Sequence, residues 1–414
     1  MNKFYIIRKG DSKIIRRHKQ SLRKFIKRSG TISKPDEKTA IKAYLGSRIT
    51  YADYIEDFCS INNIYKWEKK NNIITLEDKF GLFQNPNQVI KTLLEMLHRA
   101  KIGSQSHRVR YKGKVSFGAL YLIDNLCWEI AKKRTWQLNF QDINENEHQK
   151  LANLRSIQSS TYENTHAYMI NERVKINRSL DRKADQSYKA KSKDITDMVQ
   201  QAIRETSNKP DFDLSFNAYQ TINSTIGEHF DNIILHAPKA EFGVLCGFYD
   251  KDVKEITILI YNFGRTIAQT LTTDSLPPEM KEDIEAIIKS HIKKEFFSLK
   301  GNFSIENALT LLALQEGISS RVVFDKTRGH GITDYIEHCF ALNAGTKVVI
   351  ISGNTAIRID NKYSIENKFV LGRTRRIIAL NDDNDIFTKP DSNYVINMNL
   401  NFPGVLIETT IPLI

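Results

Sequence analysis

Cysteine is scarce in this chain, and its placement gives it no evident role. The four cysteines among 414 residues lie far apart and form no Cys-x-x-Cys pair. That spacing fits neither a disulfide framework nor a zinc site. We therefore expect buried free thiols at Cys59, Cys127, Cys246 and Cys339.

Long apolar runs are also missing. No stretch approaches the roughly 18 consecutive apolar residues that mark a membrane-spanning helix. The apolar run near Met1 is too short for the core of a signal peptide. We therefore expect a cytoplasmic protein without a membrane partner. Hydrophobic residues make up 41% of the chain, which is typical of a folded protein and excludes a largely disordered one.

Several catalytic signatures are absent. The ten histidines include no His-x-x-x-His pair, and the chain has neither Walker glycines nor a Gly-x-Ser-x-Gly elbow. Zinc-protease, P-loop and serine-hydrolase chemistry therefore have no support in the sequence.

Negative charge is almost absent from residues 1–30. This block holds 11 lysines and arginines against Asp11 alone, a net charge of +10, and the rest of the chain adds only +3. Such a block attracts polyanions, and phosphate neutralisation supplies most non-specific affinity for nucleic acid. A solvated amphipathic helix is the other interpretation, because apolar side chains at 14–26 follow helical spacing. Nucleic acid or an acidic protein is the partner expected for this block.

The chain as a whole predicts an α/β (α+β) fold in four parts. These are a basic N-terminal region at 1–85, a small α/β domain at 86–160, a basic helical linker at 161–205 and a larger domain at 206–414. Within the small domain, periodicity predicts helices and strands in alternation, which indicates an α/β layer. The helices are expected at 88–100, 117–133 and 145–154, and the strands at 107–111 and 136–140.

Part of the small domain resembles the second half of a STAS domain. The resemblance rests on Tyr111-Lys112-Gly113-Lys114-Val115-Ser116-Phe117-Gly118-Ala119-Leu120 and on Leu138-Asn139-Phe140. STAS anti-sigma antagonists carry a phosphorylated serine before that helix, and Phe117 stands at its position here. The resemblance thus implies a structural or partner-binding role for this STAS-like domain.

The larger domain begins with a patterned helix. Its order is helix, strand, strand, helical insert, glycine turn, helix and three strands. The expected helices are 217–236, 278–290, 304–315 and 329–342, and the expected strands are 242–249, 255–261, 347–352, 356–360 and 404–412.

Glu228 and Asn232 lie four residues apart on the first of these helices, in Glu228-His229-Phe230-Asp231-Asn232. That spacing places both side chains on one helix face. An amide oxygen can hold Mg²⁺ that keeps several waters and bridges to a triphosphate. A carboxylate one turn earlier can deprotonate an attacking water. An exposed acidic helix face is the alternative.

Two glycine turns follow this helix. Asn262-Phe263-Gly264 ends a strand, and Gly264 permits close approach of the backbone to a flat base. Arg328-Gly329-His330-Gly331 enters a helix, whose free N–H groups and dipole favour phosphate. A glycine-capped helix without a ligand is the alternative for this second turn.

These ordered motifs and the closing strand resemble the GHKL ATPase superfamily, which includes gyrase, the large heat-shock chaperone, histidine kinases and the mismatch-repair ATPase. The resemblance implies a Bergerat-type sandwich of a mixed sheet and helices that binds ATP and Mg²⁺. It assigns water activation to Glu228, the Mg²⁺ ligand to Asn232, and adenine recognition to Asn262 with Gly264. Phosphate contacts would come from Lys239, Arg328, Gly329, His330 and Gly331.

The adenine motif departs from the family at two positions. Asn262 replaces the usual aspartate, and Thr266 replaces the second glycine. An amide oxygen still accepts a hydrogen bond from adenine, but the amide also donates, so the preference for adenine is weakened. Residues 266–327 would form the lid over the nucleotide.

Three functions stay open at this point. The first is a hydrolase that uses ATP to switch conformation or assembly, with ATP-dependent homodimerisation as a common companion of lid closure. The second is a protein kinase of the anti-sigma or histidine-kinase type, and the third is a non-catalytic ATP sensor. The fused architecture looks bacterial, and by analogy it suggests stress response or phage defence.

Overall fold

The computed structural model describes residues 55–63, 73–101, 106–131, 137–141, 167–175, 184–207, 214–227, 242–295, 303–318 and 331–413, apart from a few positions within these ranges. Helices and strands combine in a mixed α+β fold, as the sequence predicts. None of the helices in these ranges is long and apolar enough to cross a membrane.

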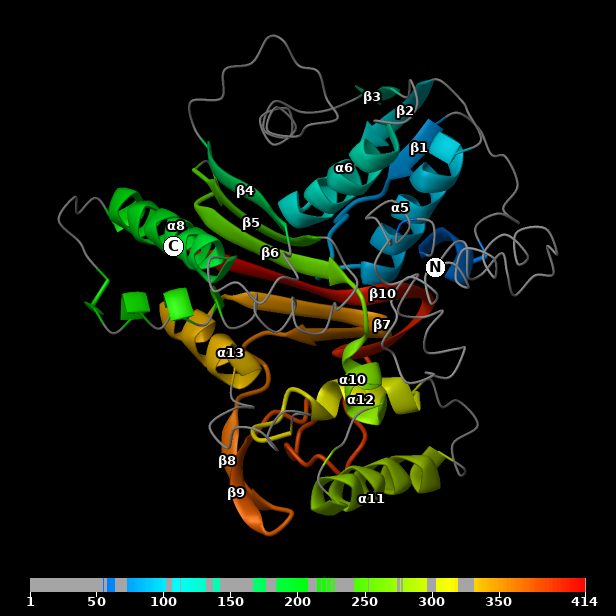
Figure 1. Cartoon of the computed structure of the whole chain (residues 1–414), viewed down its shortest axis with the longest axis vertical. Helices are drawn as coiled ribbons and strands as arrows, with labels where there is room; N and C mark the ends of the chain where they lie inside the picture. Colours follow the sequence, from blue (N-terminus) through cyan, green and yellow to red (C-terminus); the bar gives the residue numbers. More distant parts are fainter. Residues whose placement is uncertain are drawn as a thin grey trace, which may run out of the picture.

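A five-stranded sheet forms the centre of the molecule (Figure 1). Its order is β4-β5-β6-β10-β7, and every neighbouring pair is antiparallel. The strands are β4 (Ala167–Lys175), β5 (Phe242–Asp250), β6 (Glu255–Phe263), β10 (Val395–Pro412) and β7 (Lys347–Ile359). Every residue of β6 after the first is buried, as its mostly apolar sequence predicts. Both faces of the sheet are therefore covered.

β7 differs from the sequence prediction of two strands at 347–352 and 356–360. It is a single strand that bends at Gly353, where φ is 59° and the pairing with β10 shifts register. A positive φ suits glycine. Gly353, which interrupts the apolar pattern of the sequence, therefore forms a β-bulge within one strand and not a turn between two strands.

A smaller parallel sheet lies beside the large one, in the order β1-β2-β3. Its elements are β1 (Ile73–Leu76), α5 (Pro86–Lys101), β2 (Ser106–Tyr111), α6 (Phe117–Ala131) and β3 (Gln137–Gln141). The predicted elements of this stretch are confirmed apart from the helix at 145–154, which lies outside the described residues. β1 was not predicted, and it belongs to the stretch assigned to the N-terminal region.

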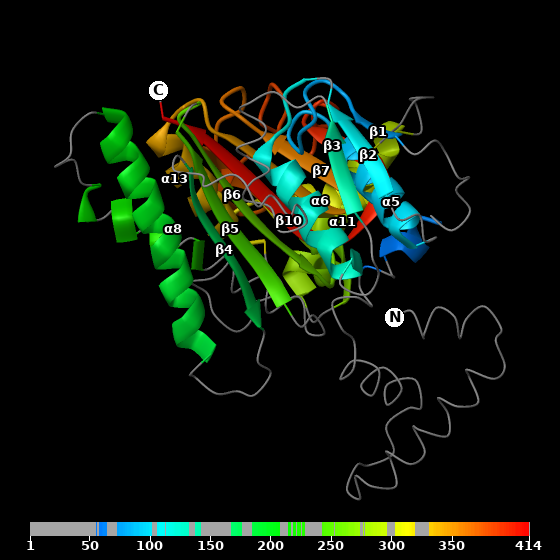
Figure 2. The same cartoon turned by 90° about the horizontal axis from the view of Figure 1, so that it is seen from above.

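α5 and α6 pack directly on one face of the large sheet, here called the back face (Figures 1 and 2). The Phe117 ring of α6 stacks on Phe248 of β5 with centroids 3.9 Å apart and an interplanar angle of 8°. Asn125 of α6 donates a 2.7 Å hydrogen bond to the hydroxyl of Tyr261 on β6. The two stretches assigned to separate domains therefore share one hydrophobic core.

The opposite face, here called the front face, is covered by α8 (Ala184–Ser207), α12 (Ile305–Leu312) and α13 (Gly331–Leu342). The stretch 161–205 is thus more than a helical linker, because it supplies the edge strand β4 and most of α8. On α8, Ile195 and Met198 contact the sheet where Gly247 leaves room for them.

The insert after β6 builds a further layer (Figure 1). It contains α10 (Ile267–Thr273) and α11 (Pro278–Glu295) before α12, and a hairpin of β8 (Glu366–Val370) and β9 (Arg373–Ile377) packs beside it. The hairpin turns at Leu371 and Gly372, both at positive φ, which is the geometry of a two-residue turn. Asn307 to Leu312 of α12 are all buried. Within the segment 266–327 that is expected to form the lid, α12 therefore belongs to the core.

Candidate functional site

The candidate site lies on the front face, and only part of it falls within the described residues. Asn262, Gly264 and the first residue of α13, Gly331, are described. The predicted site residues outside the described ranges are Glu228, Asn232, Lys239, Arg328, Gly329 and His330. The structure therefore does not test the proposed Mg²⁺ ligand or the proposed base.

The helix that would carry Glu228 begins where the sequence predicts. Described positions between 216 and 227 are helical, and Ile222 and Ile226 are buried in the front-face core. Glu228 follows Gly227 directly in the chain. The start of this helix is therefore anchored on the same face as α13.

Asn262 sits at the end of β6, with its side chain on the front face. Because side chains alternate along a strand, that of Asn262 points to the same side as Ile258 and Ile260, which belong to the front-face core. The side chain is fully buried, and its Oδ1 accepts a 3.2 Å hydrogen bond from the backbone N–H of Val405. A Cβ on Gly404 would collide with the carbonyl oxygen of Asn262, so this approach of β10 requires glycine.

This geometry limits what Asn262 can do for a nucleotide. A carbonyl oxygen has two lone pairs, and the bond from Val405 uses one of them. Because Asn262 is fully buried, a base could reach this oxygen only after the elements that cover it had moved.

The turn after β6 is held by both neighbouring strands. Gly264 donates its N–H to Pro403 at 2.9 Å, and Ile267 donates its N–H to Ser352 Oγ at 2.8 Å. Ser352 in turn donates to the carbonyl of Gly404 at 3.0 Å. The turn is thus fixed between β7 and β10.

Thr266, the second departure noted in the sequence, has a structural role. Its hydroxyl accepts the N–H of Gln269 at 3.2 Å, while the Gln269 side chain accepts the N–H of Thr266 at 3.0 Å. This reciprocal pair is a capping box, which satisfies two free donors at the start of α10. Thr266 therefore serves the helix that begins there.

Glu306 was not singled out from the sequence, yet its carboxylate reaches this turn. It lies against Gly353, where a Cβ would collide with it. Burial raises the pKa of Glu306, while hydrogen bonds from the Asn354 backbone and the Thr266 side chain lower it, with a net rise. The sequence signal was a capping pattern, Ser304-x-x-Asn307, which marks a helix start but not the reach of the next carboxylate.

The start of α13 is tied to its surroundings by Arg376 of β9. The guanidinium binds Glu316 at 3.1 Å, Asp334 at 2.7 Å and Glu337 at 2.8 Å. Asp334 lies in the first turn of α13, and Glu316 follows α12. One arginine therefore joins β9, the end of α12 and the start of α13.

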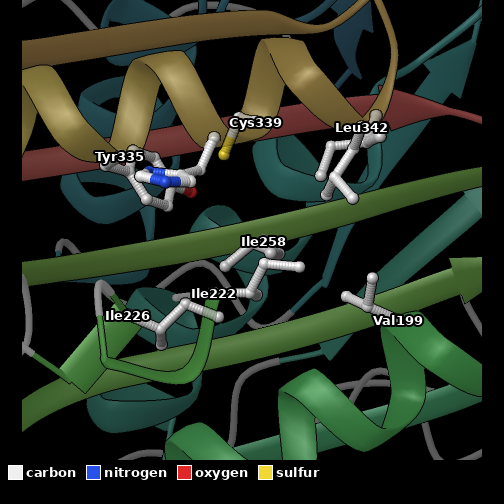
Figure 3. A pocket seen from close by; sticks show the side chains of 9 residues that line it. Val199, Ile222, Ile226, Ile258, Tyr335, Cys339 and Leu342 are labelled. Carbon is white, nitrogen blue, oxygen red and sulfur yellow. The ribbon is translucent and has the colours of Figure 1, made fainter. Parts of the chain in front are cut away.

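A small recess on the front face lies between α8, the 222–226 segment, β6 and α13 (Figure 3). Its walls are almost entirely apolar, and the Tyr335 hydroxyl already donates to Thr409 at 2.6 Å. Burial raises the pKa of the Cys339 thiol to about 12, which makes it unreactive. The recess has the character of core packing, not of a site for a polar ligand.

Thiols and acidic clusters add no second site among the described residues. Cys59, Cys246 and Cys339 are buried free thiols, as predicted, while the side chain of Cys127 is outside the described set. Within the described ranges no group of three or more histidine, cysteine or acidic side chains is arranged to hold a metal ion.

Comparison with protein-family models, with curated proteins and with solved structures found no match in any of the three.

Proposed function

We propose that this protein binds MgATP on the front face of the large sheet and hydrolyses it to drive a switch in conformation or assembly. The observation that carries the proposal is the placement of two motifs. Asn262 ends β6 with its amide on the front face, and α13, which follows the Gly-His-Gly sequence, packs in the same front-face core.

In this proposal the adenine end of the pocket is the turn at Asn262 and Gly264. The triphosphate lies at the start of α13, where Gly331 begins the helix and N–H groups favour an anion. Asn232 holds Mg²⁺ and Glu228 accepts a proton from the attacking water. The helix with Ile222 and Ile226 supports these roles, because it starts on the same face.

The proposed lid is shorter than 266–327. α12 is buried in the core and anchored by Asn307, which donates to Thr355 at 2.8 Å. An element that opens over a nucleotide cannot include this helix without breaking that core. The movable cover would therefore exclude α12.

Residues 1–30 would supply the partner contact, to nucleic acid or to an acidic protein, through a net charge of +10. The proposal also places the protein in the cytoplasm and allows a homodimer that forms with ATP. A role in bacterial stress response or phage defence fits by analogy alone.

The kinase alternative has weaker support, because the described residues at the expected phosphosite of the STAS-like part offer no evident acceptor. Phe117, at the position of the phosphorylated serine, is 4% exposed and stacked on Phe248. The neighbouring Ser116 hydroxyl accepts the N–H of Ala119 at 3.3 Å and caps α6.

The test uses the full chain with Mg²⁺ and ATP labelled on the γ-phosphate, with and without DNA or RNA. Release of phosphate that falls about 10²–10⁴-fold in Glu228→Gln supports hydrolysis with Glu228 as base. Asn232→Ala should lose Mg²⁺-dependent binding. Glu285→Gln is the matched control, because Glu285 is an exposed carboxylate on α11 that pairs only with Lys289 at 3.3 Å.

The remaining outcomes separate the alternatives. Label transferred to protein would indicate a kinase, and binding without product would indicate a sensor. If the wild-type chain binds no adenine nucleotide, the whole proposal fails.

A further inference from the structure

Arg373 and Arg375 lie on the same side of β9, two residues apart. Their guanidinium groups converge on the turn at Gly317, which follows α12. A Cβ on Gly317 would lie 3.4 Å from Nη1 of Arg375 and 3.9 Å from Nη2 of Arg373. The hairpin turn at Leu371 and Gly372 sets Arg373 immediately after the reversal of the chain.

Few of the described carboxylates offset the positive charge of Arg373 and Arg375. Arg375 is only 2% exposed, and its Nη1 donates to the carbonyl of Glu316 at 3.1 Å. Among the described residues Arg375 forms an ion pair with Asp283 of α11, at 3.5 Å, and the charge of Glu316 also acts on it. The buried Nε of Arg375 has no hydrogen-bond partner in the described structure. Arg373 is exposed and makes no hydrogen bond or ion pair with any described residue.

Arg376, the next residue, shows the contrast. It binds three carboxylates, all within 3.1 Å. Within the described part of the chain, Arg373 and Arg375 together form one ion pair, with Asp283 at a longer distance. Burial, and next the charge of Arg373, lower the pKa of Arg375. One side of β9 therefore carries surplus negative charge, and the other carries surplus positive charge.

We propose that Arg373, Arg375 and the Gly317 turn form a binding site for an oxyanion of the phosphate class. Guanidinium groups present forked donors that match phosphate oxygens. A buried donor without a partner is costly, so a ligand oxygen at Nε of Arg375 would be favourable once the residues that cover this atom move aside. A phosphate group carries up to two charges and several acceptor oxygens, so it can bind both arginines at once.

Asp283 sets the strength of this site. Its carboxylate competes for Arg375, but at 3.5 Å it is a weak acceptor that a closer oxyanion could replace. The site uses none of the residues of the proposed nucleotide pocket. It can therefore exist whether or not the protein binds ATP.

The test is equilibrium dialysis of the full chain against labelled inorganic phosphate at low ionic strength. Arg373→Gln should bind phosphate about tenfold or more weakly, with an unchanged melting temperature, because Arg373 holds no other described residue. Asp283→Asn should bind phosphate several-fold more tightly, because the competing charge is gone. The control is Lys289→Gln, which removes one positive charge from the exposed side of α11.

Two results would overturn the proposal. One is wild-type protein that retains no phosphate at millimolar concentration. The other is an Arg373→Gln variant that binds as well as Lys289→Gln does. If the site is present, displacement of phosphate by AMP or by O-phosphoserine then identifies a nucleotide or a phosphorylated side chain as the carrier.

Discussion

Replacing Glu408 with glutamine should make the protein more stable than the wild type, and this difference should grow as the pH rises. Glu408 lies on β10 in the middle of the large sheet and is 2% exposed on the back face, beneath α6. Its Oε2 has no hydrogen-bond partner among the described residues, and a Cβ on Gly118 of α6 would collide with it. Burial, and next the charge of Glu255, raise the pKa of Glu408 to about 8 from a usual 4.5.

The sign follows from proton linkage. Between these two pKa values the folded state keeps a proton that the unfolded state has lost, so stability falls as the pH rises. Each unit of difference is worth about 1.4 kcal/mol, so the loss approaches about 5 kcal/mol above pH 8. Relaxation of the surroundings makes this figure an upper estimate. The Glu408→Gln variant has no ionisable group at this position, so its folding stability does not fall in this way.

Urea unfolding of the wild type and of Glu408→Gln, followed at pH 5, 7 and 9, measures this difference. The two proteins should differ little at pH 5, by about 3 kcal/mol at pH 7 and by up to about 5 kcal/mol at pH 9. Glu285→Gln should parallel the wild type, because Glu285 is exposed. A difference that stays constant across this range would refute the reasoning.

Three further changes test the same structure. Gly118→Ala should destabilise the fold by about 1–3 kcal/mol, because the new methyl meets Glu408, and combining it with Glu408→Ala should recover part of the loss in urea titrations. Thr266→Ala should cost about 1 kcal/mol in thermal unfolding, because it removes the cap of α10; an unchanged melting temperature would argue against that capping role. Asn262→Ala should cost about 1–3 kcal/mol in urea unfolding even without nucleotide, because it strands the N–H of Val405; a fully stable variant would contradict this.

Elements with strong apolar periodicity could be predicted from the sequence. α6 and β6 are rich in apolar residues that are buried nearly continuously, so both lie close to the expected ranges. β4 could not be predicted in this way. Its sequence, Ala167–Lys175, mixes apolar and charged residues, and it becomes a strand by pairing with β5, about 75 residues away.

The hairpin β8–β9 was missed for a related reason. Its strands are short and polar, and Arg375 and Arg376 suggest a solvated loop. The turn at Leu371 and Gly372 was its one local signal. Burial of Arg375 depends on the distant α11 and Gly317, which no local pattern reveals.

For the candidate site too, local patterns predict some features, and contacts with distant residues could not be predicted. Local motifs place Asn262 at a strand end and Gly331 at a helix start, and both placements are found. The partners of Asn262 and Thr266 could not be inferred. Val405 lies 143 positions along the chain from Asn262, and its N–H donates to the oxygen that the proposed function assigns to a base.

These partners give a structural role to both residues at the adenine end of the proposed pocket. Asn262 accepts a bond from β10, and Thr266 caps α10, so the fold itself uses both residues. Under the proposed function, a base that binds there must share or replace these hydrogen bonds, and the gain from each exchange is small. At the start of α13, Arg376 offsets the charge of Asp334 and Glu337, two carboxylates that would otherwise repel a phosphate. Under the same proposal, affinity for ATP should therefore depend mainly on the triphosphate, and adenosine alone should bind weakly.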